Sequence, residues 1–472
     1  MAKNSFYLTT TLPYVNAAPH IGFALEIVEA DVIARYHRDL LGEEVIFNTG
    51  TDEHGQKIYE KALEQGVDPK SYCDEWAAKF ADLQQLLNLS FNHFIRTTDE
   101  HHIAAAQEFW RRCQANGDIY KANYKVKYCV GCELAKQDSE LIDGRCPLHP
   151  KQELELREEE NYFFRFSRYQ EQLLSLYAQD EFVKPKERLN EITAFVKQGL
   201  SDFSISRLRD KMPWGIPVPG DDEHVMYVWF DALVNYISTL SWPQNETKFT
   251  EFWPGIQLAG KDNLRQQAAM WQAMLLSAQL PPSRKILING FIGVDGQKMS
   301  KSLGNVISPT DLVKRYGLDA SRFLLINLGT FGEDMDVTFD KLDLNYNAQL
   351  ANGLGNLCSR VAKMAEQAGV SIESSVNELP TEYTSLMNAF DLKPALDCIS
   401  VKISETDKFL ASTTPWKKTG EEKTAILTEA IAQIQQIAHM LIPFMPSTAA
   451  TIKQHFQGQI QSFTTGLFAR IA

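Results

Sequence analysis

The first fifty residues alternate between strand and helix in a way that restricts this chain to a parallel α/β sheet. Residues 6–12 (FYLTTTL) are rich in β-forming side chains, and a turn containing Pro and Asn follows at 13–19. Apolar residues then recur at helical spacing over 20–40, and residues 45–48 (VIFN) predict a second strand. Such sheets bind ligands beyond the carboxyl ends of their strands, so we expect a binding site in the loops that follow these two strands.

Two changes of pattern divide the remainder of the chain. Residues 119–222 hold a cysteine cluster, an acidic run and a Pro-rich exit, and because they interrupt the alternation we interpret them as an insertion. The α/β pattern resumes at 225–230 (VMYVWF) and continues through 286–290 (ILING). After about Asp340 the strand signals disappear, and long amphipathic segments predict a helical bundle. These segments span residues 345–368, 386–410, 425–442 and 447–456.

The composition excludes several classes of protein. With 472 residues, 44% hydrophobic and 23% charged, the chain can form about three domains with a sizeable core. No stretch approaches the roughly 20 apolar residues of a membrane span, and the N-terminus lacks the apolar run of a signal peptide. Seven cysteines, three of them clustered, do not form the pattern of a disulfide framework. We therefore expect a cytoplasmic protein with reduced thiols and no membrane contact.

The charge distribution limits how a nucleic acid could bind. The net charge is −13, which disfavours a broad nucleic-acid surface. Residues 341–472 carry 11 Lys and Arg against 12 Asp and Glu, so nearly all of the excess negative charge lies in the first 340 residues. A nucleic-acid site on this chain is therefore expected to be local.

Two motifs far apart in the sequence predict a phosphate site. Residues 298–302 (KMSKS) place two lysines three positions apart, in a loop that also contains Gly293 and Gly296. His20 opens the first helix and Gly22 follows, where a helix N-terminus favours an anion and a glycine allows close approach. Alone, a helix-capping histidine or a solvated loop would explain each motif. Together, and flanked by the expected elements, they predict two halves of one nucleotide site.

A cluster of cysteine and histidine residues in the insertion has metal-binding spacing. Cys129 and Cys132 form one pair separated by two residues, and Cys146 and His149 form another. Three thiolates and one imidazole can surround Zn²⁺ tetrahedrally, and four protein ligands leave no open position, so we predict one structural zinc ion. Unligated thiols in a loop are the alternative. The remaining cysteines fall in helical patterns and are predicted as core residues: Cys73, Cys113, Cys358 and Cys398.

These motifs resemble those of the class I aminoacyl-tRNA synthetases, and specifically of the methionyl-tRNA synthetase family. The resemblance runs from about Phe6 to Ile471 and rests on several independent motifs in the family's order. They are residues 9–16 (TTTLPYVN), 51–55 (TDEHG), 227–232 (YVWFDA), 260–262 (GKD) and 290–302 (GFIGVDGQKMSKS).

The resemblance implies an architecture of the α/β class. A Rossmann-like parallel-sheet catalytic domain is split by an insertion that carries a zinc knuckle, and an α-helical bundle that binds the anticodon follows. The two catalytic halves correspond to residues 1–118 and 223–305, and the insertion to 119–222. Residues 306–340 correspond to a stem-contact region linked to the KMSKS loop, and 341–472 to the anticodon-binding domain.

The resemblance also implies an activity, that of a methionine–tRNA ligase. L-Methionine and ATP, with Mg²⁺, form methionyl-adenylate and pyrophosphate, and the methionyl group passes to the 3′-terminal adenosine of tRNA(Met). A Cys3His zinc set is one of the family's patterns. Because the appended dimerising domain of some relatives has no counterpart here, a monomer is expected.

The family's functional positions map onto individual residues of this chain. The implied catalytic residues are His20, Lys298, Lys301 and Arg207. The implied ATP contacts are His20, Gly22, Glu26, Asp262, Ile292, Lys298 and Lys301. The implied methionine contacts, with Asp52 on the ammonium group, are Leu12, Tyr14, Asp52, Trp229, Ala232, Leu233, Tyr236 and Gln267. The implied anticodon contacts are Asn356, Arg360 and Trp416.

The chain departs from the family pattern at two places. Phe23 stands where the family usually carries a second histidine that helps to stabilise phosphate charge. Asn263 and the pair Gln266–Gln267 stand where the family commonly carries Ile and an aromatic–His pair. The lysines of residues 298–302 and Asp52 are present, which favours an active enzyme.

Several alternatives stay open at this level. One is a catalytically weakened paralogue that binds tRNA without charging it. Another is a class I synthetase for a different apolar amino acid, although about 100 residues of insertion is short for such an enzyme's editing domain. For Arg207 a surface salt bridge would explain the pattern, and for the three anticodon positions helix packing with a loop-capping Trp would do so equally well.

Overall fold

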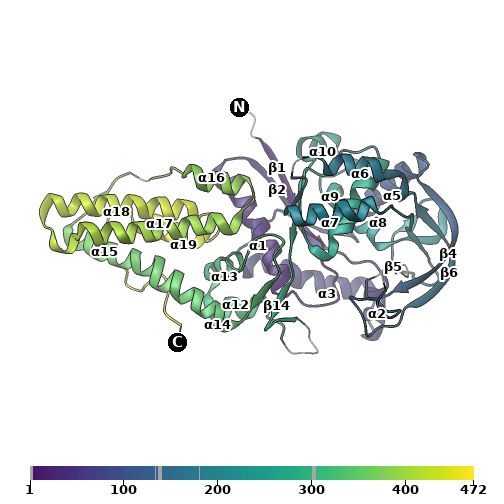
Figure 1. Ribbon diagram of the computed structural model, residues 1–472, viewed down its shortest axis with the longest axis horizontal. Helices are drawn as coiled ribbons and strands as arrows, with labels where there is room; N and C mark the ends of the chain where they lie inside the picture. Colours follow the sequence, from purple (N-terminus) through teal and green to yellow (C-terminus); the bar gives the residue numbers. More distant parts are fainter. Residues whose placement is uncertain are drawn as a thin grey trace.

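The computed structural model places the α/β part of the chain at one end and a helical bundle at the other (Figure 1). It describes residues 4–471 apart from 133, 137–140, 180, 300–304 and 375. No helix among the described residues combines the length and the apolar character needed to cross a membrane.

A six-stranded sheet forms the centre of the α/β part. Its strand order is β3-β2-β1-β12-β13-β7, and every neighbouring pair is parallel. The strands are β1 (Ser5–Thr9), β2 (Glu44–Thr51), β3 (His93–Arg96), β7 (Val183–Lys184), β12 (Ile256–Gly260) and β13 (Lys285–Asn289). The chain moves from β1 toward β2 on one side and toward β12 on the other. The carboxyl ends of β1 and β12 therefore frame the topological switch point at which such sheets bind ligands.

Helix α1 (Ile21–Arg35) is buried on nearly all sides, because it lies against the sheet and against α13 (Leu318–Ile326). Helices enclosed in this way are apolar all round, and α1 follows that rule except at three buried carboxyl groups. These belong to Glu26, Glu29 and Asp31. A π-helical turn, η1 (Tyr36–Leu40), extends the helix, so the predicted helix over 20–40 is present.

The segment predicted as an insertion contains an antiparallel sheet of order β5-β4-β6-β8. Its strands are β4 (Ile119–Cys129), β5 (Leu134–Lys136), β6 (Glu155–Phe164) and β8 (Phe203–Ser204). Between β6 and β8 the sequence contains α6 (Gln170–Tyr177), β7 and α7 (Lys186–Lys197). Strand β7 belongs to the main sheet, where it pairs with β13. The segment at 119–222 therefore also supplies an edge strand of the parallel sheet.

Residues 225–230, where we expected the α/β alternation to resume, belong to other elements. They complete β11 (Asp221–Met226) of a small antiparallel sheet and begin α8 (Val228–Ala232). The other strands of that sheet are β9 (Ser206–Leu208) and β10 (Pro217–Val218). The parallel sheet resumes only at β12. A short apolar run indicates burial, and it does not by itself distinguish a strand from a helix.

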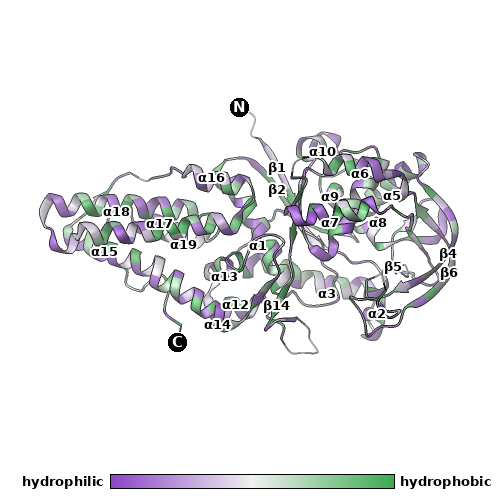
Figure 2. Cartoon of the chain, viewed as in Figure 1, coloured by the Kyte–Doolittle hydropathy of each residue, from purple (hydrophilic) through white to green (hydrophobic). Residues whose placement is uncertain are grey.

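The C-terminal third is the predicted helical bundle. Its helices are α14 (Phe339–Asn345), η7 (Tyr346–Gly355), α15 (Asn356–Ala368), α16 (Thr381–Asn388), α17 (Leu392–Thr413), α18 (Gly420–Leu441) and α19 (Pro446–His455). Hydrophobic and hydrophilic residues alternate along α17 and α18 (Figure 2), as amphipathic packing requires. Of the cysteines predicted as core residues, three are buried and Cys398 on α17 is half-buried.

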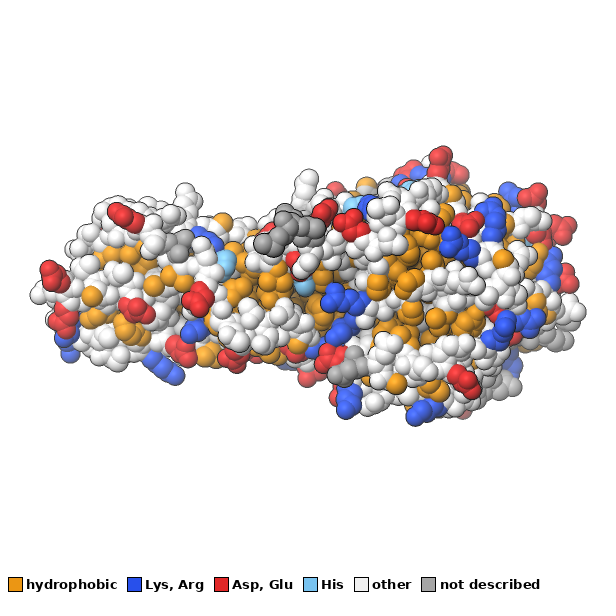
Figure 3. Space-filling model, turned by 90° about the horizontal axis from the view of Figure 1, so that it is seen from above, with side chains coloured by type: hydrophobic (Ala, Val, Ile, Leu, Met, Phe, Trp, Pro, Cys, Tyr) orange, Lys and Arg blue, Asp and Glu red, His pale blue; other side chains and the backbone are white. Residues whose placement is uncertain are grey.

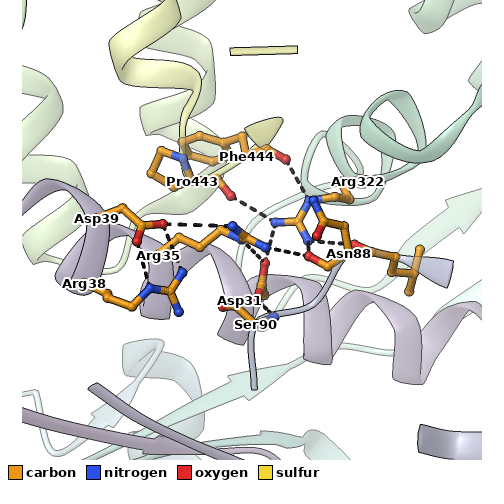
Figure 4. Close-up of polar contacts among 10 residues, drawn as sticks. Asp31, Arg35, Arg38, Asp39, Asn88, Ser90, Arg322, Pro443 and Phe444 are labelled. Atoms are coloured by element: carbon orange, nitrogen blue, oxygen red, sulfur yellow. Dashed lines mark hydrogen bonds and ion pairs between the residues drawn. The ribbon is translucent and has the colours of Figure 1, made fainter. Parts of the chain in front are cut away.

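Arg322 of α13 fastens the bundle to the α/β part (Figure 4). Its side chain is fully buried and forms an ion pair with Asp31 of α1 at 2.7 Å. Its other N–H groups donate to the carbonyls of Leu87, Pro443 and Phe444, each at 3.0 Å. The last two carbonyls lie between α18 and α19, so one guanidinium group joins the α/β part to the helical bundle.

We expect Arg322→Met to destabilise the fold strongly, because Asp31 would stay buried with Arg35 as its remaining cationic partner. Removing one partner of a buried ion pair costs about 3–5 kcal/mol. The matched control is Arg315→Met, which removes a more exposed pair with Asp343 and is expected to change the stability little. Denaturant unfolding followed by circular dichroism measures both variants, and equal losses would contradict the assigned role of Arg322.

Candidate active site

The predicted nucleotide half of the site lies where β1 leads into α1. His20 caps the helix, and its Nδ1 accepts a hydrogen bond from the Gly22 N–H at 3.0 Å. A ring nitrogen that accepts carries no proton, so Nε2 of the neutral ring carries it and can donate. The ring is exposed, yet partial desolvation holds its pKa below the ordinary value, with Asp262 partly opposing the shift. His20 is therefore a neutral donor beside a helix N-terminus, where anions are favoured.

Gly22 and Phe23, the next residues of α1, have different roles near His20. A Cβ atom at position 22 would lie 2.9 Å from Cε1 of His20, so glycine is what allows the ring to fold over the helix start. Phe23 is half-buried, and its ring meets Phe80 of α3 (Pro69–Ala81) edge-on with centroids 5.5 Å apart. The residue that stands in place of the family's second histidine thus packs on the core and offers no donor.

Two carboxyl groups act electrostatically in the region of His20, and they come from the two halves of the sheet. Glu26 of α1 accepts from the Thr11 N–H at 2.7 Å and from the Thr11 hydroxyl at 2.6 Å. Burial raises the pKa of Glu26 to about 8, although these hydrogen bonds oppose the shift. Asp262 is exposed in the short turn η4 (Lys261–Asn263) after β12, and its charge acts on the pKa values of both Glu26 and His20. The sheet therefore brings these three predicted ATP contacts into electrostatic reach of one another.

A hairpin follows β13 and leads toward the KMSKS segment. It consists of β14 (Ile292–Val294) and β15 (Gln297–Lys298), and β14 also pairs with β16 (Met335–Val337). Asp295 and Gly296 turn the chain with positive φ angles of 54° and 69°. Ile292, whose backbone is predicted to contact adenine, begins this hairpin and is buried.

The phosphate contacts of the two lysines of the motif stay predictions. Lys301 lies outside the described residues, and Lys298 is described in its backbone, as the last residue of β15.

The predicted ammonium ligand, Asp52, directly follows β2 and is 2% exposed. Its backbone pairs with the loop after β1: its N–H donates to the Pro13 carbonyl at 3.0 Å, and its carbonyl accepts from Val15 at 3.4 Å. This pairing places Tyr14 beside Asp52. The Tyr14 ring in turn meets Trp229 edge-on, with centroids 6.2 Å apart. Three of the predicted methionine contacts are thus held together.

The predicted thioether wall comes from α8 and from α9 (Asn235–Ser238). Its members are Trp229, which is half-buried, and the nearly fully buried Ala232, Leu233 and Tyr236. Leu12 is half-buried in the loop after β1.

Gln267 completes this wall from the π-helical turn η5 (Gln266–Met270) and is 1% exposed. Its Nε2 donates to the Tyr236 hydroxyl, so one lone pair of that hydroxyl is occupied and its proton can be donated elsewhere. Burial raises the pKa of Tyr236, and the charges of Glu26 and Asp52 add to the shift, so the hydroxyl stays protonated. The amide that replaces the family's histidine therefore leaves Tyr236 a donor.

Arg207 of β9 is 4% exposed, which excludes the alternative of a surface salt bridge. Its guanidinium donates to the Ser204 hydroxyl at 2.9 Å and to the Ser206 carbonyl at 2.6 Å. The same group lies over the rings of Tyr227 and Tyr128, 4.5 Å and 5.2 Å from their centroids. Because Tyr128 precedes Cys129, Arg207 connects the strand before α8 to the metal-ligand cluster.

The four predicted zinc ligands lie together at the end of β4, with all ligand atoms within 4.8 Å of one another. Nδ1 of His149 is 3.2 Å from Sγ of Cys132 and 3.7 Å from Sγ of Cys129, and Sγ of Cys132 is 3.4 Å from Sγ of Cys146. Tetrahedral Zn²⁺ places neighbouring sulfur and nitrogen ligands about 3.5–3.8 Å apart. The donor set and its spacing therefore fit Zn²⁺, with His149 presenting Nδ1.

The predicted anticodon residues lie in the bundle. Asn356 and Arg360 are one turn apart on α15, and Arg360 forms an ion pair with Asp407 of α17 at 2.9 Å. Trp416 follows α17 in the short turn η8 (Pro415–Lys417) and is 50% exposed. A Trp that only capped a loop would bury its ring, whereas a ring that stacks on an unpaired base has to be exposed.

The surface around these residues is hollowed but not strongly basic. A groove of about 510 Å³ lies between η7 and α17, and Asp407, the partner of Arg360, lines it together with Lys408. On the face seen in Figure 3, Lys and Arg side chains are scattered among Asp and Glu. This distribution agrees with a local nucleic-acid site.

Sequence reasoning missed a set of polar residues beside the predicted methionine pocket: the buried Glu53, His54, His102 and Asp231, and the half-buried Arg96. The available signal was ionisable residues inside otherwise apolar or buried motifs, such as the Asp in YVWFDA. Their partners lie 43 to 177 positions away, so sequence spacing did not reveal the pairs.

Comparison with protein families gives a match to class I tRNA synthetases (M) over residues 6–154 and 132–362. Among similar sequences, a methionine–tRNA ligase of Nostoc sp. is 40% identical over 96% of this chain and 90% of its own length. One from Thermotoga maritima is 41% identical over 95% of this chain and 74% of its own length.

Solved structures give the same result. Methionyl-tRNA synthetase of Mycobacterium tuberculosis in complex with methionyl-adenylate superimposes with a TM-score of 0.90 at 34% identity. The superposition covers 99% of this chain and 100% of that chain.

Proposed function

The chain belongs to the class I tRNA synthetases of the methionine type, and on that basis we propose that it is a methionine–tRNA ligase. It activates L-methionine with ATP to methionyl-adenylate, releases pyrophosphate, and transfers the methionyl group to the 3′-terminal adenosine of tRNA(Met). The observation that carries this proposal is that His20 follows β1, Asp52 follows β2 and Asp262 follows β12, all beyond the carboxyl ends of one parallel sheet.

In the first step the methionine carboxylate attacks the α-phosphate of ATP and pyrophosphate leaves. No side chain needs to act as nucleophile, so positioning and charge stabilisation carry the reaction. His20 donates from Nε2 to the phosphates, and Lys298 and Lys301 close over the leaving pyrophosphate. Mg²⁺ bound with ATP supplies further neutralisation of phosphate charge.

The remaining ATP contacts follow from the same crevice. Glu26 and Asp262 bind the ribose, and because Glu26 has a raised pKa of about 8 it is protonated over most of the neutral range. A protonated carboxyl group can donate to one oxygen and accept at the other, and it adds no charge beside a polyphosphate. Gly22 lets the nucleotide approach α1, and the backbone of Ile292 reads the adenine.

Methionine binds with its ammonium group on Asp52. Its side chain packs against Tyr14, Trp229 and Tyr236. A thioether accepts only weak hydrogen bonds, so a single oriented hydroxyl, that of Tyr236, is matched to it. Leu12, Ala232, Leu233 and Gln267 line the rest of the slot. Arg207 supports activation from the β9 side, where it is already desolvated.

In the second step the 2′-hydroxyl of the terminal tRNA adenosine attacks the methionyl-adenylate. The anticodon is read in the bundle, where Asn356 and Arg360 contact base edges and Trp416 stacks on an unpaired base. Zn²⁺, held by Cys129, Cys132, Cys146 and His149, would fix the fold of the insertion and would not take part in chemistry.

One chain supplies every residue of this scheme, so we propose that it acts as a monomer with ATP, L-methionine and tRNA(Met) as its ligands. A cytoplasmic location is part of the proposal. It is supported by the seven cysteines, none of which forms a disulfide.

ATP–pyrophosphate exchange with methionine, leucine, isoleucine and homocysteine tests the first step. We expect methionine to lead leucine and isoleucine in kcat/KM by at least about 10–200-fold, the discrimination an apolar pocket gives for small differences in shape. Lys301→Ala, prepared in the same way, controls for a contaminating host enzyme and should be nearly inactive. Exchange led by leucine or isoleucine would overturn the substrate, and no exchange with any of the four would overturn the enzyme.

Trp416→Ala tests the anticodon role. Loss of a base-stacking ring costs about 1–3 kcal/mol, so kcat/KM for tRNA(Met) should fall about 5–150-fold in aminoacylation while exchange stays unchanged. Trp416→Phe is the matched control and should keep most of the aminoacylation rate, because it keeps an aromatic face. If exchange and aminoacylation fell together, Trp416 would be a packing residue.

A further inference from the structure

Three consecutive ionisable residues follow β2, and all three are buried. Asp52 is 2% exposed, Glu53 is fully buried and His54 is 5% exposed. Buried charge is costly unless it is paired and hydrogen-bonded, so the partners of Glu53 and His54 decide how rigidly this segment is held.

Glu53 is anchored to the sheet side of the site. Its carboxylate accepts two hydrogen bonds from Arg96 of β3, at 2.6 Å and 2.9 Å, and further ones from the hydroxyls of Thr51 and Thr98. Its backbone carbonyl accepts from the Trp214 indole at 2.6 Å. A bidentate Arg–carboxylate pair fixes orientation as well as position, so the residue after Asp52 cannot shift without breaking several bonds.

His54 is anchored to the opposite side, through Asp231 of α8. Nδ1 of His54 lies 2.7 Å from one oxygen of Asp231, and Nε2 of His102 lies 2.8 Å from the other. His102 belongs to α5 (Glu100–Ala115), and its Nδ1 lies 2.9 Å from the hydroxyl of Ser238 in α9. Asp231 and His102 are fully buried and Ser238 is 1% exposed.

Asp231 shows which groups donate in this series of hydrogen bonds. Burial alone would raise the pKa of Asp231, but the charge and hydrogen bonds of His54 and His102 outweigh it and hold the pKa below the ordinary value. Asp231 is therefore a carboxylate that accepts at both oxygens, and each imidazole donates to it. Nδ1, the other ring nitrogen of His102, forms the bond to the Ser238 hydroxyl.

Three residues of this hydrogen-bonded series lie two positions from predicted methionine contacts. His54 is two residues after Asp52, Asp231 is two residues after Trp229, and Ser238 is two residues after Tyr236. One buried carboxylate thus ties together the segment that carries the ammonium ligand and both segments that carry the thioether wall.

We propose that Asp231 is a positioning residue for methionine recognition, which through His54 and His102 holds the ammonium ligand in register with the thioether wall. This inference rests on the proposed function. It assigns Asp231 no contact with methionine or ATP. Its effect is on the alignment of Asp52 with Trp229 and Tyr236.

Asp231→Asn tests the proposal, because asparagine keeps the shape but replaces one accepting oxygen by a donating amide. The amide faces an imidazole N–H, so one of the two bonds is lost or its histidine must change tautomer. A small misplacement of a binding group costs up to about 100-fold, so the methionine KM in exchange should rise about 10–100-fold. The ATP KM and the kcat at saturating methionine should stay within about threefold.

Asp118→Asn is the matched control. Asp118 is an equally buried aspartate, bonded to Tyr169, Ser277 and Arg168, none of which is a predicted site residue. It should lower the unfolding temperature without a selective rise in the methionine KM. If both aspartate variants changed methionine and ATP parameters alike, Asp231 would have only a structural role and the proposal would be overturned.

A pair of variants at His54 decides the question if Asp231→Asn does not fold. His54→Asn keeps an N–H near the position of Nδ1, whereas His54→Ala removes it. The methionine KM of His54→Asn should lie at least about tenfold below that of His54→Ala, and equal values would overturn the proposal. An inactive wild-type protein would instead refute the proposed function, and with it this inference, so the two failures are distinguishable.

Discussion

Buried carboxyl groups set the geometry of the crevice between β1 and β12, and the rest of the site depends on them. The sheet is assembled from strands at residues 5–96 and 256–289, with β7 supplied from the segment between them, so no local contact can align these stretches. Polar bonds cross that division instead: Asn289 of β13 donates to Glu29 of α1 at 2.6 Å, and Asp231 of α8 receives His54 from the segment after β2. Inside a protein such bonds are strong and direction-dependent, so they fix register where apolar packing alone would allow sliding.

The same principle connects the crevice to the bundle. α1 starts directly after its cap, His20, and carries Asp31 in its last turns, where Arg322 binds both Asp31 and the carbonyls between α18 and α19. A single buried helix therefore spans from the predicted phosphate site to the domain predicted to read the anticodon. For an enzyme that must hold both ends of one tRNA, a fixed distance between these sites is a requirement of the substrate.

Much of this architecture could be predicted from sequence because its signals are local. The first strand and helix, the cysteine spacing and the amphipathic helices each show within about twenty residues, and the structure has all of them. Other features depend on distant partners. β7 has only two residues and no periodicity, and β11 joins a sheet whose other strands have three and two residues. The rings over Arg207 belong to Tyr128 in β4 and to Tyr227 between β11 and α8. The His54–Asp231–His102 chain likewise joins residues that only the finished fold brings together.

In the proposed function Asp52, held by its buried neighbours, recognises the ammonium group of methionine. Calorimetric titration with L-methionine and with 4-(methylthio)butanoate, which lacks the amino group, tests it most directly. A buried charge pair is worth about 2 kcal/mol or more, so the wild-type protein should bind L-methionine at least about 30-fold more tightly. Asp52→Asn should lose that preference while it keeps weak binding of both compounds. An undiminished preference in Asp52→Asn would show that Asp52 does not bind the ammonium group.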